Sequence, residues 1–219
     1  MRSEAVKDAL LADIGNTHCH IYDGKTVEHL TYDDAIDKYQ RQTLYYICVN
    51  YQLSDKIEKI HRWKNIAYVM HIEGEYETMG VDRKALCLSR KNGIFVDAGS
   101  AITVDVVEDG RYIGGFILPG IKAYLQSFQS ISSVLDIDLH KTPSFKVLPT
   151  TTKEQISYGI IASIKALIEK HSKGKTLYCT GGDGKFLSSY FDKAIYDETL
   201  VFQGMKRALH ASEELGIRN

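Results

Sequence analysis

Two stretches of the chain share an arrangement of residues that suits the binding of phosphate groups. The first, residues 10–24, reads LLADIGNTHCHIYDG, and the second, residues 93–110, reads GIFVDAGSAITVDVVEDG. In each, an apolar run ends in an aspartate, Asp13 or Asp97, and is followed by a glycine, a small polar residue and a second apolar run that closes on Asp-Gly. Glycine lets backbone N–H groups approach an anion, and an aspartate at a strand end can hold a cation. The pattern predicts two phosphate-binding loops.

The repetition of this arrangement predicts a duplicated architecture. The two aspartates lie about 84 positions apart, and each motif reads as a strand, a glycine turn, a second strand and an Asp-Gly hairpin. The elements that follow each motif combine strands with helices, which is typical of an α/β protein. We therefore expect two similar α/β lobes, 1–90 and 91–219, that grip a polyphosphate between them.

The elements expected in the first lobe come from hydrophobic patterning and capping residues. The runs at 43–50 and 66–71 are rich in β-branched and aromatic residues and predict strands. Between them, Ser54 can begin a short helix that ends at Trp63. Residues 82–90 have a helical pattern with Asp82 in position to cap it.

The second lobe is expected to hold more helix. The run GGFILPG at 114–120 predicts the end of a strand and a turn into an amphipathic helix. A long helix is predicted over 153–171, with Thr152 and Gln155 as a capping box and Gly174 after its end. A buried strand at 176–184, a helix at 185–191 and a final helix at 203–215 complete the pattern.

The composition excludes several classes of protein. The 219 residues are 44% hydrophobic and 25% charged with a formal net charge of −1, so no basic surface for nucleic acid or a membrane is indicated. The apolar runs have strand length, too short to cross a bilayer, and the N-terminal stretch does not read as a cleaved signal. Four scattered cysteines without a C-x-x-C pair suggest free thiols in a reducing compartment, so we expect a cytoplasmic protein.

The sequence His18-Cys19-His20 suggests a metal site, but strand geometry argues against it. On a strand, His18 and His20 face one way and Cys19 the other, and no nearby cluster completes a ligand set. We interpret the three as ordinary strand residues with respect to metal binding.

With these motifs placed, the chain resembles the type III pantothenate kinases of the acetate and sugar kinase, Hsp70 and actin superfamily, over about residues 10–210. Five motifs carry the resemblance in the family's order. They are D-x-G-N-T (Asp13–Thr17), G-x-D-R (Gly80–Arg83), D-x-G-[TS]-A-x-T-x-D (Asp97–Asp105), G-G-x-I-x-P-G (Gly114–Gly120) and T-G-G (Thr180–Gly182). Ser100 replaces the family's commoner threonine and keeps its hydroxyl group.

The resemblance implies a fold and an activity. The fold is α/β, with two duplicated ribonuclease H-like (actin-like ATPase) lobes, each with a mixed sheet flanked by helices. The implied activity is the ATP-dependent phosphorylation of pantothenate to 4′-phosphopantothenate, the first step of coenzyme A biosynthesis. Mg²⁺, a monovalent cation (K⁺ or NH₄⁺) and a homodimeric assembly are implied, with no nucleic acid or membrane partner.

The resemblance also assigns residues to ATP and its cations. Asp13 is expected near Mg²⁺, and Asp97 at the monovalent cation. The residues expected to contact ATP are Asp13, Ile14, Gly15, Asn16, Thr17, His18, Cys19, His20, Ser100, Thr180, Gly181 and Gly182.

For the acceptor, the resemblance makes Asp82 the catalytic base. By sequence alone, Asp82 could only cap the helix that it begins, and both roles can coexist. Substrate contacts are implied for Tyr76, Gly80, Val81, Asp82, Arg83 and Thr152. Arg83 is the candidate partner of the pantothenate carboxylate, whereas Thr152 could equally be only a helix cap.

Two other functions remain open from the sequence. One is another small-molecule kinase or phosphatase of the same superfamily. The other is a non-enzymatic, actin-like protein that regulates or assembles in response to nucleotide. The residues of the acceptor pocket distinguish a pantothenate kinase from another kinase or phosphatase of the superfamily. Consumption of ATP that depends on an acceptor distinguishes it from a regulatory or assembly protein.

Overall fold

The computed structural model describes residues 10–139, 144–172 and 174–215, which form two compact units. Unit 1 comprises Met1–Asn92, Val106–Gly114 and Glu198–Asn219, of which 1–9 and 216–219 lie outside the described residues. Unit 2 comprises Gly93–Asp105 and Gly115–Asp197. The expected division at residue 90 put the last helix in the second lobe, whereas its contacts place it in unit 1.

Two five-stranded sheets repeat one strand order. The first is ordered β3-β2-β1-β4-β5, from β1 (Leu10–Ile14), β2 (Cys19–Tyr22), β3 (Val27–Leu30), β4 (Leu44–Cys48) and β5 (Trp63–Asn65). The second is ordered β8-β7-β6-β9-β10, from β6 (Gly93–Ala98), β7 (Ala101–Glu108), β8 (Arg111–Pro119), β9 (Leu177–Thr180) and β10 (Ile195–Tyr196).

In each sheet the strand that ends in the motif aspartate is central, with a hairpin partner on one side and a parallel strand on the other. β1 pairs antiparallel with β2 and parallel with β4, and β6 pairs parallel with β9. The matching orders confirm the predicted α/β duplication.

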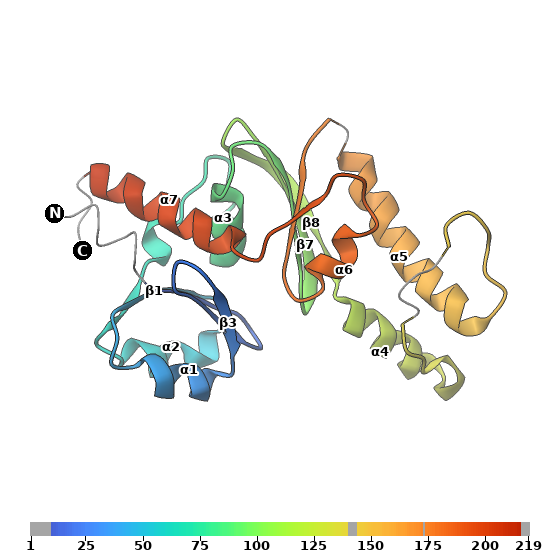
Figure 1. Ribbon diagram of the computed structural model, residues 1–219, viewed down its shortest axis with the longest axis horizontal. Helices are drawn as coiled ribbons and strands as arrows, with labels where there is room; N and C mark the ends of the chain where they lie inside the picture. The colour runs from blue at the N-terminus through green and yellow to red at the C-terminus, as the bar shows by residue number, and fades with distance from the viewer. Residues whose placement is uncertain (1–9, 140–143, 173, 216–219) are drawn as a thin grey trace. The chain divides into compact units, whose positions relative to one another are not determined.

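Helices cover both faces of the first sheet (Figure 1). The helices α1 (Tyr32–Tyr39) and α2 (Tyr51–Glu58) lie on one face, and α3 (Val81–Leu88) and α7 (Leu200–Glu214) lie on the other. A short 3₁₀ helix, Ala67–Val69, follows β5. The helices of unit 2 are α4 (Ile121–Ile131), the 3₁₀ turn Ser133–Leu135, α5 (Thr152–His171) and α6 (Gly184–Ser188).

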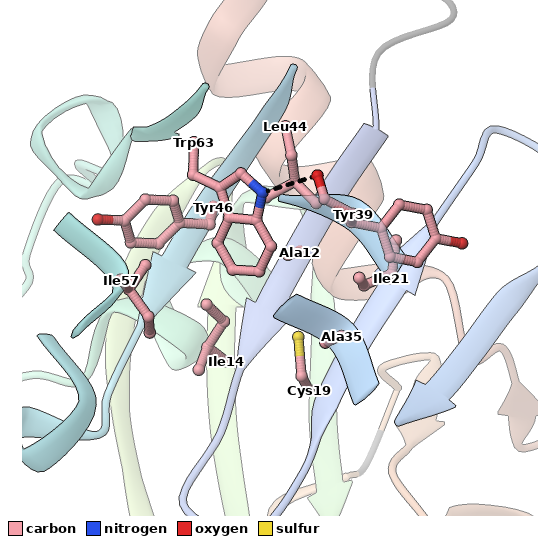
Figure 2. Close-up of a cluster of buried hydrophobic side chains, with 10 residues drawn as sticks. All are labelled: Ala12, Ile14, Cys19, Ile21, Ala35, Tyr39, Leu44, Tyr46, Ile57 and Trp63. Atoms are coloured by element: carbon pink, nitrogen blue, oxygen red, sulfur yellow. Dashed lines mark hydrogen bonds between the residues drawn. The ribbon is translucent and has the colours of Figure 1, made fainter. Parts of the chain in front are cut away.

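The core between the first sheet and α1 and α2 is mostly apolar and contains a buried hydrogen bond. Figure 2 shows the indole Nε1 of Trp63 donating to the carbonyl oxygen of Tyr39 at 3.1 Å. Burying each large side chain of this kind stabilises the fold by roughly 1.5–3 kcal/mol. The cluster consists of Ala12, Ile14, Cys19, Ile21, Ala35, Tyr39, Leu44, Tyr46, Ile57 and Trp63.

A close backbone contact joins α3 to α7. A Cβ atom added to Gly204 of α7 would lie only 1.7 Å from the carbonyl oxygen of Ala85 in α3. Glycine within a helix costs about 1 kcal/mol relative to alanine, so its presence here is explained by the approach of the two backbones. The helix that carries Asp82 is therefore held against α7.

Three expected N-caps lie one to four residues away from the N-caps that the structure shows. The N-cap of α2 is Asn50, whose Oδ1 accepts the N–H of Gln52 at 3.0 Å, so Ser54 lies inside the helix. The N-cap of α5 is Thr151, whose side chain pairs with Glu154. Gly80 is the N-cap of α3.

The run at 66–71 was wrongly predicted as a strand, and α1 was not predicted. Ile66, Met70 and Ile72 are buried, but the chain between them forms a 3₁₀ turn. The start of α1 carries a capping signal, because the side chain of Thr31 accepts the N–H of Asp34. Within the described ranges, no helix is long and apolar enough to cross a membrane.

Candidate active site

The first predicted phosphate loop is a tight turn between β1 and β2. The Gly15 N–H donates to the His18 carbonyl at 3.0 Å, and Asn16 and Thr17 are exposed at the tip of the turn. Asp13 lies at the end of β1, directly across from His20 on β2, and its Oδ1 atom is buried. The loop therefore combines an oxygen ligand suited to a hard cation with exposed groups that can reach a phosphate.

The histidines beside this loop form a hydrogen-bonded pair. The Nδ1 atoms of His20 and His29 are 2.7 Å apart, so one ring donates and the other accepts. Burial, with His29 and His18 nearby, lowers the pKa of His20 to about 4, so that ring is neutral at neutral pH. The Nε2 atom of His29 lies 3.7 Å from a carboxylate oxygen of Glu198.

Cys19 lies on the opposite face of β2, within the apolar core. Burial, reinforced by Asp13 and Cys48, raises the pKa of its thiol to about 12, so the side chain is a protonated core residue. A contact between Cys19 and ATP could therefore come only from its backbone. In the part of the chain that the structure describes, no group of three or more His, Cys, Asp or Glu residues could hold a metal ion.

In unit 2, the second predicted loop is packed closely against two glycines, Gly181 and Gly120. A Cβ atom on Gly181 would lie 2.4 Å from Oδ1 of Asp97 and 2.5 Å from the carbonyl oxygen of Ala98. A Cβ atom on Gly120 would lie 2.3 Å from the carbonyl oxygen of Gly99. Any larger residue at these two positions, which belong to the G-G-x-I-x-P-G and T-G-G motifs, would collide with the loop.

This loop also gathers oxygen atoms that could hold a cation. The Asp97 carboxylate and the Ala98 carbonyl both border Gly181, whose φ of +85° favours glycine. Carboxylate and carbonyl oxygens are the ligands of hard cations, so the donor set fits a monovalent ion. The site is held in place because Asp183 N–H donates to the Ala98 carbonyl at 2.9 Å. Ser100 is exposed at the tip of the loop.

The T-G-G motif continues this group. Thr180 is the last residue of β9, pairs in register with Asp97 on β6, and is buried. Gly181 and Gly182 then turn the chain into α6. The structure thus places Asp97 beside the Thr180–Gly182 turn, with Ser100 on the loop that follows Asp97.

The G-x-D-R motif places a carboxylate at the start of α3. The Oδ1 atom of Asp82 accepts the N–H of Arg83 at 2.8 Å. A Cβ atom on Gly80 would lie 2.5 Å from the same oxygen, so the carboxylate folds back over the glycine. The positive end of the helix dipole stabilises a negative charge there. Asp82 thus stabilises the start of the helix without being its N-cap. Its carboxylate can take this position only because residue 80 has no side chain.

Arg83 is buried between two tyrosines. Its Nη1 donates to the hydroxyl oxygen of Tyr76 at 2.5 Å and its Nη2 to that of Tyr112 at 3.4 Å. Tyr76 is 41% exposed, whereas Tyr112 is buried. Sequence reasoning missed Tyr112, which lies in β8 outside every motif.

A second missed feature fixes the segment that carries Tyr76. Glu75 accepts hydrogen bonds from Lys84 Nζ at 2.8 Å, from the Ile72 N–H at 2.8 Å and from His71 Nδ1 at 3.1 Å. Burial raises the pKa of Glu75, but the bonds from Lys84, Ile72 and His71 outweigh it and leave that pKa below its ordinary value. Lys84 follows Arg83 directly, so this ion pair ties the Tyr76 segment to the first turn of α3.

Thr152 lies at the first position of α5 and is exposed. Because Thr151 performs the capping, the interpretation of Thr152 as a helix cap is wrong. A cavity of about 290 Å³ lies beside this helix start and is lined by Ser144, Val147, Leu148, Pro149, Thr150, Glu154 and Tyr158. The hydroxyl group of Thr152 is thus not used for capping, and it lies near a cavity large enough for a small molecule.

Comparison with solved structures defines the fold class. The chain is similar to the activator of the 2-hydroxyisocaproyl-CoA dehydratase from Clostridium difficile, solved with bound ADPNP, with a TM-score of 0.57, 11% sequence identity, and coverage of 96% of this chain and 98% of that one. At this identity the likeness shows the fold alone. With the repeated sheet order, it places the chain among proteins with the duplicated, two-lobed actin-like ATPase fold.

The sequence comparisons are more specific. The family model for type III pantothenate kinase matches residues 56–173. A type III pantothenate kinase from Helicobacter hepaticus is 41% identical over 202 residues, which cover 91% of this chain and 98% of the relative. A structure from Campylobacter jejuni, described as a Baf family transcriptional activator, has a TM-score of 0.85 and 36% identity, covering 94% of this chain and 99% of that one. The chain belongs to the type III pantothenate kinase family.

Proposed function

We propose that the protein transfers the γ-phosphoryl group of ATP to the primary hydroxyl of pantothenate, forming 4′-phosphopantothenate in the first step of coenzyme A biosynthesis. Membership of the family supports this function. The structural observation that carries it is the Asp82 carboxylate, held over Gly80 at the start of α3 beside the buried Arg83.

In this proposal Asp82 accepts the proton of the attacking hydroxyl. Phosphoryl transfer needs an oriented nucleophile and a group that takes its proton, since most of the remaining catalysis is positioning and charge stabilisation. One oxygen of Asp82 is held by the Arg83 N–H, which fixes the carboxylate for proton transfer.

Arg83 is proposed to bind the pantothenate carboxylate, because a guanidinium group matches a carboxylate in two-point hydrogen bonding. Tyr76 supports this role, as it is half exposed and hydrogen-bonded to Arg83. Val81 and Gly80 would present backbone to the substrate. Thr152 would add a hydroxyl contact.

ATP is proposed to bind the loop Asp13–His20, Ser100 and Thr180–Gly182. Asp13 would hold Mg²⁺, which supplies charge neutralisation on the phosphates when bound, and a single carboxylate is enough for an ion that keeps most of its waters. Asp97 and the Ala98 carbonyl would hold K⁺ or NH₄⁺. Neutral His20 would donate its Nε2–H to a phosphate oxygen in the tautomer whose Nδ1 accepts the hydrogen bond from His29.

We further propose a cytoplasmic homodimer in which Thr152 reaches the acceptor site of the partner subunit. Unit 2 exposes large apolar side chains at the end of α4, in the 3₁₀ turn that follows it and in the segment that leads into α5, namely Ile131 (71%), Val134 (76%), Val147 (71%) and Leu148 (73%). An exposed apolar patch is typical of an interface between proteins, and these side chains are proposed to form one.

The proposal is tested by coupled measurement of ADP release with and without pantothenate. Release that depends on pantothenate supports the kinase. Release that depends on a different small alcohol indicates another kinase of the superfamily. Slow release that no acceptor changes indicates a nucleotide-switched regulatory or assembly protein.

A further inference from the structure

We infer that Tyr32 is a positioning residue for the first phosphate loop: its hydroxyl anchors the Gly15 carbonyl and so holds the Asn16-Thr17 tip in place for ATP. This role deepens, and rests on, the nucleotide site proposed above. Tyr32 belongs to none of the motifs and lies on α1, outside the loop itself.

The contact that carries the inference is a direct hydrogen bond. The Tyr32 hydroxyl donates to the carbonyl oxygen of Gly15 at 2.9 Å, across a sequence separation of 17 residues. The N–H of Gly15 donates to the His18 carbonyl at 3.0 Å. Both backbone polar groups of Gly15 are thus held by the protein, which fixes the base of the turn.

The phenol has a second partner that orients its hydrogen. The Nδ2 atom of Asn50 lies 3.4 Å from the Tyr32 hydroxyl oxygen and donates to it. A hydroxyl that accepts from Asn50 has its single hydrogen left for Gly15. Asn50 is itself fixed, because its Oδ1 accepts the Gln52 N–H as the N-cap of α2.

The position of Tyr32 is also fixed from its own helix. Tyr32 is the first residue of α1, immediately after the N-cap Thr31. Its ring packs against the buried core cluster of Figure 2. An ion pair of 2.7 Å between Lys56 and Asp33 joins α2 to the same turn of α1. The hydroxyl is therefore delivered to Gly15 by a rigid support, and a loop fixed before binding spends less free energy on ordering when ATP arrives.

The test compares Tyr32→Phe with Tyr39→Phe. Both tyrosines lie on α1, and each substitution removes one hydrogen bond made by a phenolic hydroxyl. In Tyr39→Phe the lost bond is the one donated to Glu28 at 3.1 Å, away from the phosphate loop. We expect Tyr32→Phe to weaken ATP binding, measured by titration calorimetry without pantothenate, by about three- to tenfold, the effect of one hydrogen bond. The KM for ATP should rise in parallel, while the KM for pantothenate and the values for Tyr39→Phe stay near those of the unaltered protein.

Equal ATP dissociation constants for the two folded variants would overturn the role of Tyr32. If Tyr32→Phe does not fold, Asn50→Asp takes its place: the carboxylate still caps α2, but it competes with Gly15 for the phenolic hydrogen. ATP binding as tight as in the unaltered protein would then overturn the inference. Because ATP binding is measured alone, failure of the proposed reaction with pantothenate gives a separate result.

Discussion

Replacing Gly80 with alanine should lower kcat strongly while leaving the fold nearly intact. The new Cβ atom would lie 2.5 Å from Oδ1 of Asp82, whereas a nonbonded contact of this kind needs about 3.3 Å. The carboxylate must therefore move by about 0.8 Å. The backbone need not move, because Gly80 has φ −57° and ψ 139°, a conformation that alanine adopts readily.

A displacement of about 1 Å in a catalytic group can cost 10²-fold in rate, so we expect kcat to fall by about 10- to 100-fold. The loss of stability should stay near 1 kcal/mol, the cost of a poorer N-cap, which is about 2–4 °C in Tm for a chain of this size.

The assay is steady-state ADP release with pantothenate, beside thermal unfolding. The matched control is Gly159→Ala, because Gly159 lies exposed in α5 with nothing within 4 Å of an added Cβ. That variant should keep its kcat and gain about 1 kcal/mol of stability. A folded Gly80→Ala protein with a kcat within about twofold of the unaltered protein would refute the proposed placement of Asp82.

Three further outcomes follow from the site. Asp97→Asn should weaken ATP use and abolish the advantage of K⁺ or NH₄⁺ over Na⁺ or Tris at fixed ionic strength; equal rates in all four ions for the unaltered protein would remove the cation site. Because the pKa of Glu75 is lowered by folding, its contribution to stability is present above the ordinary value of 4.5 and is lost as the pH falls through the lower, folded value. Urea unfolding should therefore show Glu75→Gln less stable than the unaltered protein at neutral pH and the difference shrinking in acid; a difference independent of pH would contradict this. Random co-assembly of Asp82→Asn with a bulky Thr152 variant should restore about a quarter of all sites if the two residues act in trans, because about half of the dimers are heterodimers and each of these has one intact site; background activity in verified heterodimers would exclude that.

The duplicated fold could be predicted because its signal is local. An apolar run ending in Asp-x-Gly marks the central strand of each sheet, and both copies occupy that place in the structure. The conformational needs of Gly120 and Gly181 were not visible in the sequence. Each is required by the approach of another backbone segment, which only the folded chain brings near.

The errors have a similar cause. The run at 66–71 is apolar because tertiary contacts bury Ile66 and Met70, and composition alone could not separate a buried turn from a strand. The start of α5 was placed one residue late, although Thr151 and Glu154 form the S/T-x-x-E pattern of a capping box.

The candidate acceptor residues came from the G-x-D-R motif and, for Tyr76 and Thr152, from the family resemblance alone. Gly80–Arg83 could be found from the motif, but Tyr112 and Glu75 carry no local signal for the contacts that they make with Arg83 and Lys84. Both contacts join α3 to segments elsewhere in the chain and depend on the fold.

The central claim is that Asp82 serves phosphoryl transfer to pantothenate. The most direct measurement is mass spectrometry of the products formed from ATP and pantothenate by the unaltered protein and by Asp82→Asn, whose side-chain oxygen can still accept the Arg83 N–H. We expect 4′-phosphopantothenate from the unaltered protein, and its formation by the folded variant to be slower by about 10²–10⁴-fold, as for the loss of a general base. Release of inorganic phosphate without phosphorylated pantothenate, or equal product formation by both proteins, would contradict the account.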